Sequence, residues 1–548
     1  MLRIKGGRVF DPANGINGVV QDLVVRDGRI CDPSEPNPAG RTLDATGMVV
    51  FPGGVDAHTH VAGGAMNFTR VMTPEDHRRT QHFIRSKTRR AGVGGFAPNT
   101  FATGYLYAGM GWTTVNEAAV PVLSALHAHE ELRDVPIVDK SCLVLMANNE
   151  MVLDMIEQGD YDRAKQIVAW YINSAKAFGV KAVNPGGVAA WKWGEDAKQL
   201  SSPIAGYSRI SPGDIVGNLA KICNELNLPH PMHLHCNNLG APGNIETTLE
   251  TMRYLEGQRT HLAHLQYHAY GGDSWDSMNS ESLRLAEYFN ANPNFTTDAG
   301  AVLFGDCVTI TADGPWQHLL YQLTGRKWGN VDVENETGCG IVPYRYKPNN
   351  PVNAVQWAVG LELLLLIDDP WRVSLTTDHP NGACFWRYPE VIHLLMSKDY
   401  RDECMKILPD SVLSKIHLHE ITREYSLYEI ATLISAGPAR ALGMEQKGNL
   451  GVGKDADIVI YADIDDVEAM FAHPRYVIKG GEIVIDDGDI GEVPEGREFI
   501  VEPECDPEIA SFLKPKFEEC YTVAFDNYAV DVQDLHNPEV VPLKSQSD

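Results

Sequence analysis

The stretch MVVFPGGVDAHTH at residues 48–60 decides how the rest of the chain is interpreted. An apolar run leads through two glycines into a His-x-His pair at its end. Because successive side chains of a strand point to opposite faces, His58 and His60 project from the same face. Two imidazoles on one face can bind one metal ion, although such a pair alone is weak evidence. The stretch therefore predicts a buried strand that ends in two metal ligands, provided that further ligands converge on them.

Seven more apolar runs follow this stretch, and helical stretches such as 73–90 and 162–178 lie between them. Alternating strands and helices are typical of a parallel sheet or barrel. The pattern predicts an α/β fold whose main unit, over residues 51–440, is a TIM-type (β/α)8 barrel. The eight candidate strands are 48–60, 111–120, 137–149, 178–187, 230–238, 260–268, 294–304 and 371–382.

The two ends of the chain carry a different pattern. Residues 1–50 and 441–488 both read as short alternating strands separated by glycine turns. We therefore expect them to form one small β-sandwich domain, into which the barrel is inserted. Residues 489–548 are rich in Glu, Asp and Pro and are expected to be an extension that contacts the rest of the protein or another protein chain.

Composition excludes several classes of protein. The 548 residues carry 46 basic and 73 acidic side chains, a net charge of −27 that disfavours binding to nucleic acid or anionic lipid. No apolar run approaches the roughly 18 residues of a membrane span, and no signal-peptide core is visible, so a cytoplasmic protein is expected. The ten cysteines include no CxxC pair, which argues against a disulfide framework, an iron–sulfur cluster or a zinc ribbon in this chain.

Further candidate ligands end the later strands. His233 and His235 repeat the His-x-His spacing, His264 follows on the next strand, and Asp378 ends the last one. A barrel of this type gathers the carboxyl ends of its strands around one active site. The sequence therefore predicts that these four side chains and the first histidine pair surround a metal centre.

Lys181, at the end of the fourth strand, is the candidate that would allow two metals. Burial lowers the pKa of a lysine, and its neutral amine can then add CO2 to give a carbamate that bridges two cations about 3.5 to 4 Å apart. The alternative, a lysine paired with an acidic neighbour, is equally compatible with the sequence. Lys192 is a poorer candidate because it lies beyond the strand in a polar loop.

Several loop residues are weaker candidates. Asn67, Asn99, His268 and His379 follow strand ends and would either contact substrate or serve as loop caps and supports for the ligands. Asp298, Asp306 and Asp313, on or after the seventh strand, are less favoured candidates for the same role.

Nucleotide-binding and protease motifs lack support. Residues 448–454 read G-x-x-x-x-G-K, but Asp455 stands where a phosphate loop requires Ser or Thr. No HExxH pattern occurs, so zincin protease chemistry is not expected.

Together, these residues resemble the amidohydrolase superfamily, which combines a metal-binding barrel with a flanking sheet domain. Four long strings, at residues 55–70, 181–195, 232–248 and 261–275, are more specifically similar to the A-subunit family of formylmethanofuran dehydrogenases. The resemblance extends over nearly the whole chain.

This resemblance implies a dinuclear zinc site. His58 and His60 would bind one zinc, carboxylated Lys181 would bridge, and Asp378 would be both ligand and proton carrier. His264 and one histidine of the fifth strand would bind the second zinc, and the choice between His233 and His235 stays open.

The resemblance also implies a reaction and partners. A separate tungsten or molybdenum pterin subunit, served by iron–sulfur subunits, would reduce CO2 to formate, and this chain would condense that formate with the amine of methanofuran without a redox cofactor of its own. One alternative is the hydrolase subunit of a formyltransferase/hydrolase complex. Others are a stand-alone cyclic amidase of the dihydropyrimidinase or hydantoinase kind, and a scaffold without activity.

Overall fold

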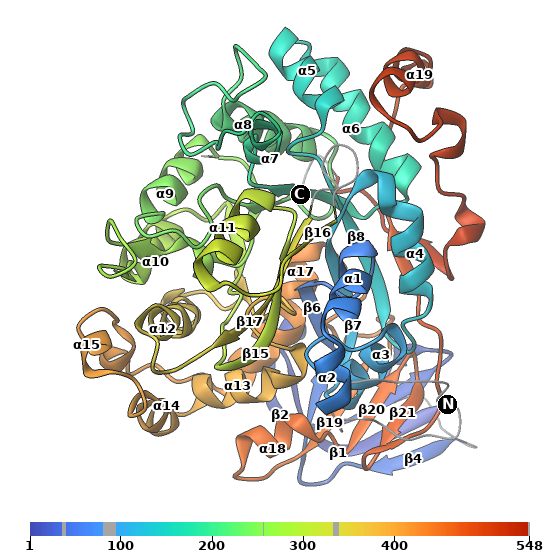
Figure 1. Cartoon of the computed structure of the whole chain (residues 1–548). Helices are drawn as coiled ribbons and strands as arrows, with labels where there is room; N and C mark the ends of the chain where they lie inside the picture. The colour runs from blue at the N-terminus through green and yellow to red at the C-terminus, as the bar shows by residue number, and fades with distance from the viewer. Residues whose placement is uncertain (35–39, 80–94, 256, 332–338, 546–548) are drawn as a thin grey trace.

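The computed structural model describes residues 1–34, 40–79, 95–255, 257–331 and 339–545. Its two large sheets divide the chain as Figure 1 shows: one sheet is surrounded by helices, and the other contains the blue N-terminal and orange C-terminal strands. In the part of the chain so described, no helix is both long and apolar enough to cross a membrane.

The helix-surrounded sheet is a nearly closed parallel barrel, which confirms the predicted fold class. Its barrel strands pair in chain order, and a parallel bridge between Thr59 and His379 brings the last strand segment back beside the first. Both faces of most of these strands are buried, as expected where helices cover a parallel sheet. The strands are β6 (Gly54–Thr59), β7 (Trp112–Val120), β8 (Asp139–Leu145), β9 (Gly179–Val183), β10 (Met232–His235), β11 (Thr260–Leu262), β14 (Phe295–Asp298) and β18 (Val373–Ser374).

An outer layer of helices follows the strands. The start of α8 is set by local sequence. Ser211 is the N-cap and forms a reciprocal capping box with Asp214, and Pro212 occupies the first turn. Of the helix expected over 73–90, the described part is α2 (Pro74–Arg79), and the remainder lies outside the described residues. The other main helices are α3 (Thr100–Gly109), α4 (Ala125–Arg133), α5 (Glu150–Gln158), α6 (Tyr161–Ala175), α8 (Pro212–Glu225), α9 (Ile245–Tyr254), α10 (Ser282–Ala291), α12 (Pro351–Leu366), α13 (Tyr388–Met396) and α17 (Gly437–Leu442).

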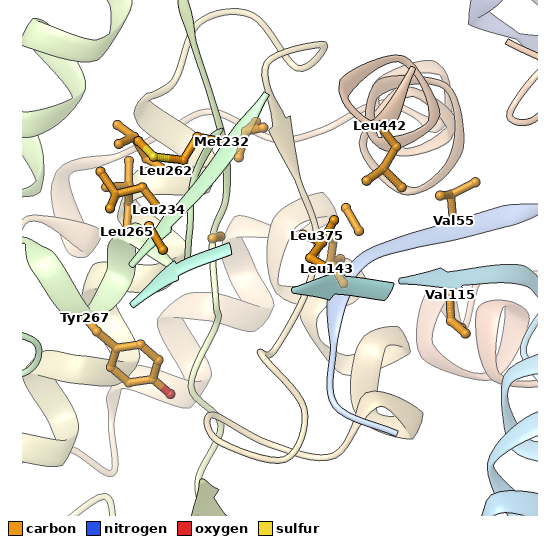
Figure 2. Packing of buried hydrophobic residues seen from close by; sticks show 14 of the residues in the cluster. Val55, Val115, Leu143, Met232, Leu234, Leu262, Leu265, Tyr267, Leu375 and Leu442 are labelled. Carbon is orange, nitrogen blue, oxygen red and sulfur yellow. The ribbon is translucent and has the colours of Figure 1, made fainter. Parts of the chain in front are cut away.

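Alternation along each strand separates the apolar layer from the polar interior. Met232 and Leu234 of β10 gather with Leu262 of β11 in the cluster of Figure 2. Because side chains alternate along a strand, His233 and His235 point to the other face. In another part of the same cluster, Val55 of β6 lies close to Leu442 of α17 (Figure 2). The chemistry-bearing side chains are therefore directed into the barrel.

The opening stretch is two strands, so its interpretation as a single strand over 48–60 was wrong. β5 (Met48–Pro52) belongs to the second sheet and pairs with β19 (Ile458–Ala462), whereas β6 belongs to the barrel. Gly53 separates them, and a Cβ on this residue would lie 2.2 Å from the Thr113 hydroxyl oxygen. The chain changes sheets where only glycine fits against β7.

The second sheet joins the two ends of the chain, as predicted. Its strands are mostly antiparallel, and β1 pairs with β2 and, in parallel, with β5. The described strands of this sheet are β1 (Leu2–Asp11), β2 (Ile16–Arg26), β3 (Arg29–Cys31), β4 (Arg41–Asp44), β5, β19, β20 (Tyr476–Lys479), β21 (Glu482–Asp486) and β22 (Asp489–Ile490).

The C-terminal segment packs on the barrel. β23 (Glu498–Ile500) pairs in parallel with the first residues of β8, and β24 (Pro538–Val540) pairs with β23. The red helix α19 (Ile509–Cys520) lies beside α6 (Figure 1). Phe517 of α19 contacts Trp170 of α6. The domain boundaries at 50, 440 and 488 stay predictions.

An insertion between β14 and β18 contributes to the mouth of the barrel. It contains α11 (Gly314–Thr324) and a three-stranded antiparallel sheet of β15 (Gly305–Thr311), β17 (Cys339–Tyr346) and β16 (Gly329–Val331). We call this insertion the lid, described at residues 305–331 and 339–346, because its side chains line one cavity together with those at the carboxyl ends of the barrel strands.

Candidate metal centre

A cavity of about 240 Å³ opens where the barrel strands end. Six of the predicted site residues line it, and they come from five strand ends widely spaced in the sequence. All six are buried. These residues are His58, His60, Lys181, His235, His264 and Asp378.

Asp378 lies close to both histidines of the first pair. Its Oδ1 is 3.1 Å from His58 Nε2 and 3.2 Å from His60 Nε2. Burial opposes ionisation of this carboxyl, but the neighbouring His58 and His264 hold its pKa well below the usual value. Burial likewise acts to lower the pKa of His60, yet Asp378 and Glu117 raise it to about 9. The three side chains thus form a place where a cation, either a proton or a metal ion, is stabilised.

Two carboxylates lie at hydrogen-bond distance from the Nδ1 atoms of these imidazoles. Glu117 Oε1 is 2.9 Å from His60 Nδ1, and Asp298 Oδ2 is 2.9 Å from His58 Nδ1. A carboxylate that accepts the Nδ1 proton leaves the lone pair of Nε2 free for a metal, which is the usual support of a metal-binding histidine. Glu117 also accepts the backbone N–H of Val61. Both carboxylates therefore orient candidate ligands.

Sequence reasoning did not find Glu117, and it considered Asp298 only as a weak candidate for substrate contact. The available signal was a single charged residue in each of two strands, because a carboxylate buried within β7 or β14 needs a partner inside the barrel.

Lys181 projects from β9 into the same cavity. Within the described residues its Nζ has no hydrogen-bond partner, although it is buried. Burial lowers the pKa of its amine to about 8. The sequence left open the alternative that Lys181 pairs with an acidic neighbour. Among the residues described, no acidic side chain lies at hydrogen-bond distance from its Nζ.

His235 and His264 form the opposite wall, with ring centroids 4.8 Å apart. Neither His235 Nε2 nor His264 Nδ1 has a hydrogen-bond partner among the described residues, and Asp313 lies 3.5 Å from His235 Nε2. His264 and Asp378 both adopt the left-handed backbone region, with φ of 32° and 49°. Non-glycine residues are strained there, and such strain is concentrated at functional sites.

His233 lies behind His58 instead of lining the cavity. Its Nε2 is 3.1 Å from His58 Nδ1, and its Nδ1 is 3.0 Å from His230 Nε2. The two histidines of β10 point into the barrel as their spacing requires, but they occupy different depths. His235 reaches the cavity, and His233 is covered by the layer above it.

The weaker candidates lie outside the cavity lining. Asn99 is the N-cap of α3 and accepts the N–H of Ala102, and Asn67 lies on α1 (Gly64–Met72), 3.2 Å from His127 Nε2. His268 and His379 are buried, and the His268 ring stacks on His264 with centroids 5.5 Å apart. Their proposed role in substrate contact stays a prediction.

The remaining alternatives make other contacts. Lys192 pairs with Glu150 at 2.8 Å on the surface. Asp306, on β15 of the lid, is 3.7 Å from Arg345. Asp313 caps α11 and accepts a hydrogen bond from Asn184 as well as lying near His235.

Beyond the polar end, the cavity has aromatic and amide walls. The lid and the start of α12 contribute most of them, and no local sequence pattern connects these segments with the barrel mouth. Aromatic faces with a few polar groups suit an organic substrate that is held by stacking and oriented by hydrogen bonds. The walls include Tyr267, Trp275, Trp316, Tyr344, Tyr346, Asn350 and Gln356.

The donor set fits divalent cations such as zinc. Buried polar atoms normally have hydrogen-bond partners, and five around this cavity have none with hydrogen-bond geometry among the described residues, although Asp378 Oδ1 lies 3.1 Å from His58 Nε2. Four of the five are imidazole nitrogens and a carboxylate oxygen, which are donors that zinc prefers. The five atoms are His58 Nε2, Lys181 Nζ, His235 Nε2, His264 Nδ1 and Asp378 Oδ1.

Comparison with known proteins gives likenesses over almost the whole length. Residues 41–485 match the profile of the Amidohydrolase family. The chain is 42% identical to Protein FwdA of Methanocaldococcus jannaschii over 98% of each chain. It is 37% identical to the A subunit of the formyltransferase/hydrolase complex Fhc of Methylorubrum extorquens, over 97% of this chain and 96% of that one.

A solved structure is also similar to this chain over almost its whole length. The crystal structure of the formyltransferase/hydrolase complex FhcABCD from Methylorubrum extorquens, in complex with methylofuran, contains a chain that is 36% identical. The TM-score is 0.93, and the match covers 99% of this chain and 100% of the other. The likeness therefore includes the barrel, the terminal sheet and the C-terminal segment.

Proposed function

The chain belongs to the amidohydrolase family, and on that premise we propose that it cleaves and forms the formamide C–N bond of an N-formylated furan amine at a dinuclear zinc centre. The observation that carries this proposal is the convergence, at the polar end of an aromatic cavity, of three imidazole nitrogens, a carboxylate oxygen and a lysine amine that make no hydrogen bond among the described residues. The near-full-length likeness to one chain of a complex solved with methylofuran supports the class of substrate. Methanofuran, the amine implied by the sequence resemblance, is of the same class.

The reaction balances as formamide plus water giving amine plus formate. When bound, the two cations would polarise the formyl carbonyl and lower the pKa of a water molecule. Asp378, beside both His58 Nε2 and His60 Nε2, is placed to take a proton from that water and to pass it to the departing amine nitrogen. By microscopic reversibility, the same carboxylate removes a proton from the amine when formate is condensed.

Lys181 supplies the bridging group in this proposal. Its buried amine adds CO2 with loss of one proton, which gives a carbamate with two oxygen donors. The lowered pKa of the lysine, about 8, favours the neutral amine that this addition requires. With the carbamate between them, His58 and His60 would bind one cation, and His235 and His264 the other.

Formate release by the purified full chain tests the proposal. We expect N-formylmethanofuran to be hydrolysed, a chelator to abolish the activity, and Zn²⁺ with bicarbonate to restore it. His60→Ala would remove metal and activity together, whereas His127→Ala, at an exposed histidine on α4, would leave both unchanged. Faster turnover of hydantoin or dihydrouracil than of the formamide would contradict the proposal and favour a cyclic amidase.

We further propose that the chain works within a multi-subunit complex and that its partners set the direction of the reaction. Isolation through a tag on this chain distinguishes the two directions. Tungsten or molybdenum, with iron–sulfur subunits, in the isolated complex would support condensation of formate made from CO2. A formyltransferase partner without a pterin metal would support hydrolysis, the direction in the name of the Fhc relative.

A further inference from the structure

Three buried imidazoles form a chain from the metal centre toward the opposite end of the barrel. His58 Nδ1 is 3.1 Å from His233 Nε2, and His233 Nδ1 is 3.0 Å from His230 Nε2. The chain ends at a backbone group, because His230 Nδ1 is 2.8 Å from the carbonyl oxygen of Ala441. All three side chains are fully buried.

The carbonyl at the end determines where every proton of this chain lies. A neutral imidazole has one N–H donor and one acceptor nitrogen, and a carbonyl oxygen only accepts. His230 therefore donates from Nδ1 to Ala441, and its Nε2 accepts from His233 Nδ1. His233 Nε2 then accepts from His58 Nδ1, which leaves the lone pair of His58 on Nε2.

The buried environment of these side chains favours neutral imidazoles. Burial holds the pKa of His230 well below the usual value, and this imidazole lies beside those of His233 and His261. Asp298 Oδ2 lies 3.4 Å from His233 Nε2. With one proton on each imidazole, the tautomer of one link decides that of the next.

We infer that His230, set by the Ala441 carbonyl, is a positioning residue that acts through His233 to hold His58 in the tautomer whose Nε2 can bind a metal. The inference rests on the proposed function only in taking His58 Nε2 as a metal ligand. It also assigns different roles to the two histidines of β10, with His235 at the cavity and His233 in the chain.

The reversed tautomer of His233 would work against the metal site. Its Nε2–H would face the Nδ1–H of His58 at 3.1 Å, and the repulsion would be relieved if His58 moved its proton to Nε2. An imidazole protonated at Nε2 cannot donate that nitrogen to a metal. Asp298, at 2.9 Å from His58 Nδ1, favours the productive tautomer, and the chain adds a second acceptor on the same side.

Zinc affinity of the full chain, measured by competition with a chelator, tests the inference. We expect His230→Phe, which keeps the ring but not the hydrogen bonds, to weaken Zn²⁺ binding about 10- to 100-fold, as loss of an outer support does. His230→Gln can donate its amide N–H to Ala441 and accept from His233, so it is expected to retain most of the affinity. Wild-type affinity in His230→Phe, or equal losses in both variants, would overturn the inference.

Nitrogen NMR of the histidine side chains in the metal-free wild-type chain gives a readout that does not depend on metal binding. We expect His58, His233 and His230 each to carry the proton on Nδ1. An Nε2-protonated His230 or His233 would overturn the inference even if the enzyme binds zinc. If the wild-type chain bound no zinc, the proposed function would fail, and the observed tautomers would still decide whether the chain of imidazoles is ordered as inferred.

Discussion

Two buried polar clusters among the described residues lie at opposite ends of the barrel, and they differ in how completely their charges are paired. The candidate metal centre lies at the carboxyl ends of the strands and contains Lys181, whose Nζ has no hydrogen-bond partner among the described residues. The other cluster, here called the basal cluster, consists of Asp139, Asp455, Asp457, Lys447, Lys479 and Arg497. Asp139 is the first residue of β8, so this cluster lies at the amino ends of the strands.

In the basal cluster every charge has partners. Lys447 Nζ is 2.6 Å from Asp457 and 2.9 Å from Asp455, and it also pairs with Asp139. Burial acts to lower the pKa of Lys447, but these carboxylates raise it above the usual value, whereas burial lowers that of Lys181 to about 8. Three acidic and three basic side chains balance one another, and they tie β8 to the terminal sheet and to the C-terminal segment.

The difference separates a structural cluster from a site that needs a ligand. The three basal carboxylates lie close enough to one another to hold a cation, as His58, His60 and Asp378 do. In the basal cluster, however, lysine amines already occupy that space. Proximity of ligand-type side chains is therefore a weaker criterion for a metal site than buried ligand atoms without partners.

The largest effect is expected from Asp378→Asn. The amide keeps the shape of the side chain but cannot carry the proton, so formate release should fall by about 100- to 10,000-fold. The measurement is kcat on N-formylmethanofuran in zinc-loaded protein. Asp306→Asn, at an exposed carboxylate of the lid, is the matched control and should leave kcat unchanged. A similar loss in both variants would mean that overall charge, and not the proton carried by Asp378, matters.

Removing a lysine should have opposite consequences in the two clusters. Lys447→Met leaves Asp139, Asp455 and Asp457 buried with too little positive charge, so the free energy of unfolding should fall by about 3 to 5 kcal/mol. Zinc bound per folded chain should not change. Denaturant unfolding and metal analysis of the purified chain measure the two quantities.

Lys181→Met is the comparison variant. It removes an amine that has no hydrogen-bond partner among the described residues, so the metal-free protein should lose little stability, and bound zinc should be lost. If Lys181→Met unfolded the protein as Lys447→Met does, the contrast between the two clusters would be wrong.

The sequence predicted the barrel and the cavity side of the metal centre because both depend on local patterns. Apolar runs indicated the strands, and histidines at their ends indicated side chains that line the cavity. The depth of a side chain inside the barrel depends on what covers it, so sequence could not separate His233 from His235. The lid walls and Glu117 were missed for the same reason, since contacts between distant segments leave no local pattern.

The pH dependence of stability tests the state of Lys181. Its pKa is lowered from 10.5 to about 8 in the folded protein, so between these values the unfolded chain binds more protons than the folded chain. Stability of the metal-free protein should therefore rise with pH in this window, by at most about 1.4 kcal/mol per pH unit from this group. Below about pH 8 the contribution is constant and unfavourable.

The measurement is the free energy of unfolding of metal-free wild type minus that of Lys181→Met, from about pH 7 to 10. A rising difference supports an unpaired amine. A difference that does not change with pH, or that falls, would show that Lys181 has a charge partner like those of the basal cluster.

The smallest effect is expected at two asparagines that differ in one respect. Asn99 and Asn350 are both helix N-caps, of α3 and α12, and each accepts a backbone N–H, from Ala102 at 2.8 Å and from Val352 at 2.9 Å. Replacing either by Ala should lower the free energy of unfolding by about 1 kcal/mol. Of the two, Asn350 alone lines the cavity, so only Asn350→Ala should raise KM for the formylated amine. An increase in KM for Asn99→Ala would instead place substrate near the start of α3, where the sequence alone allowed it.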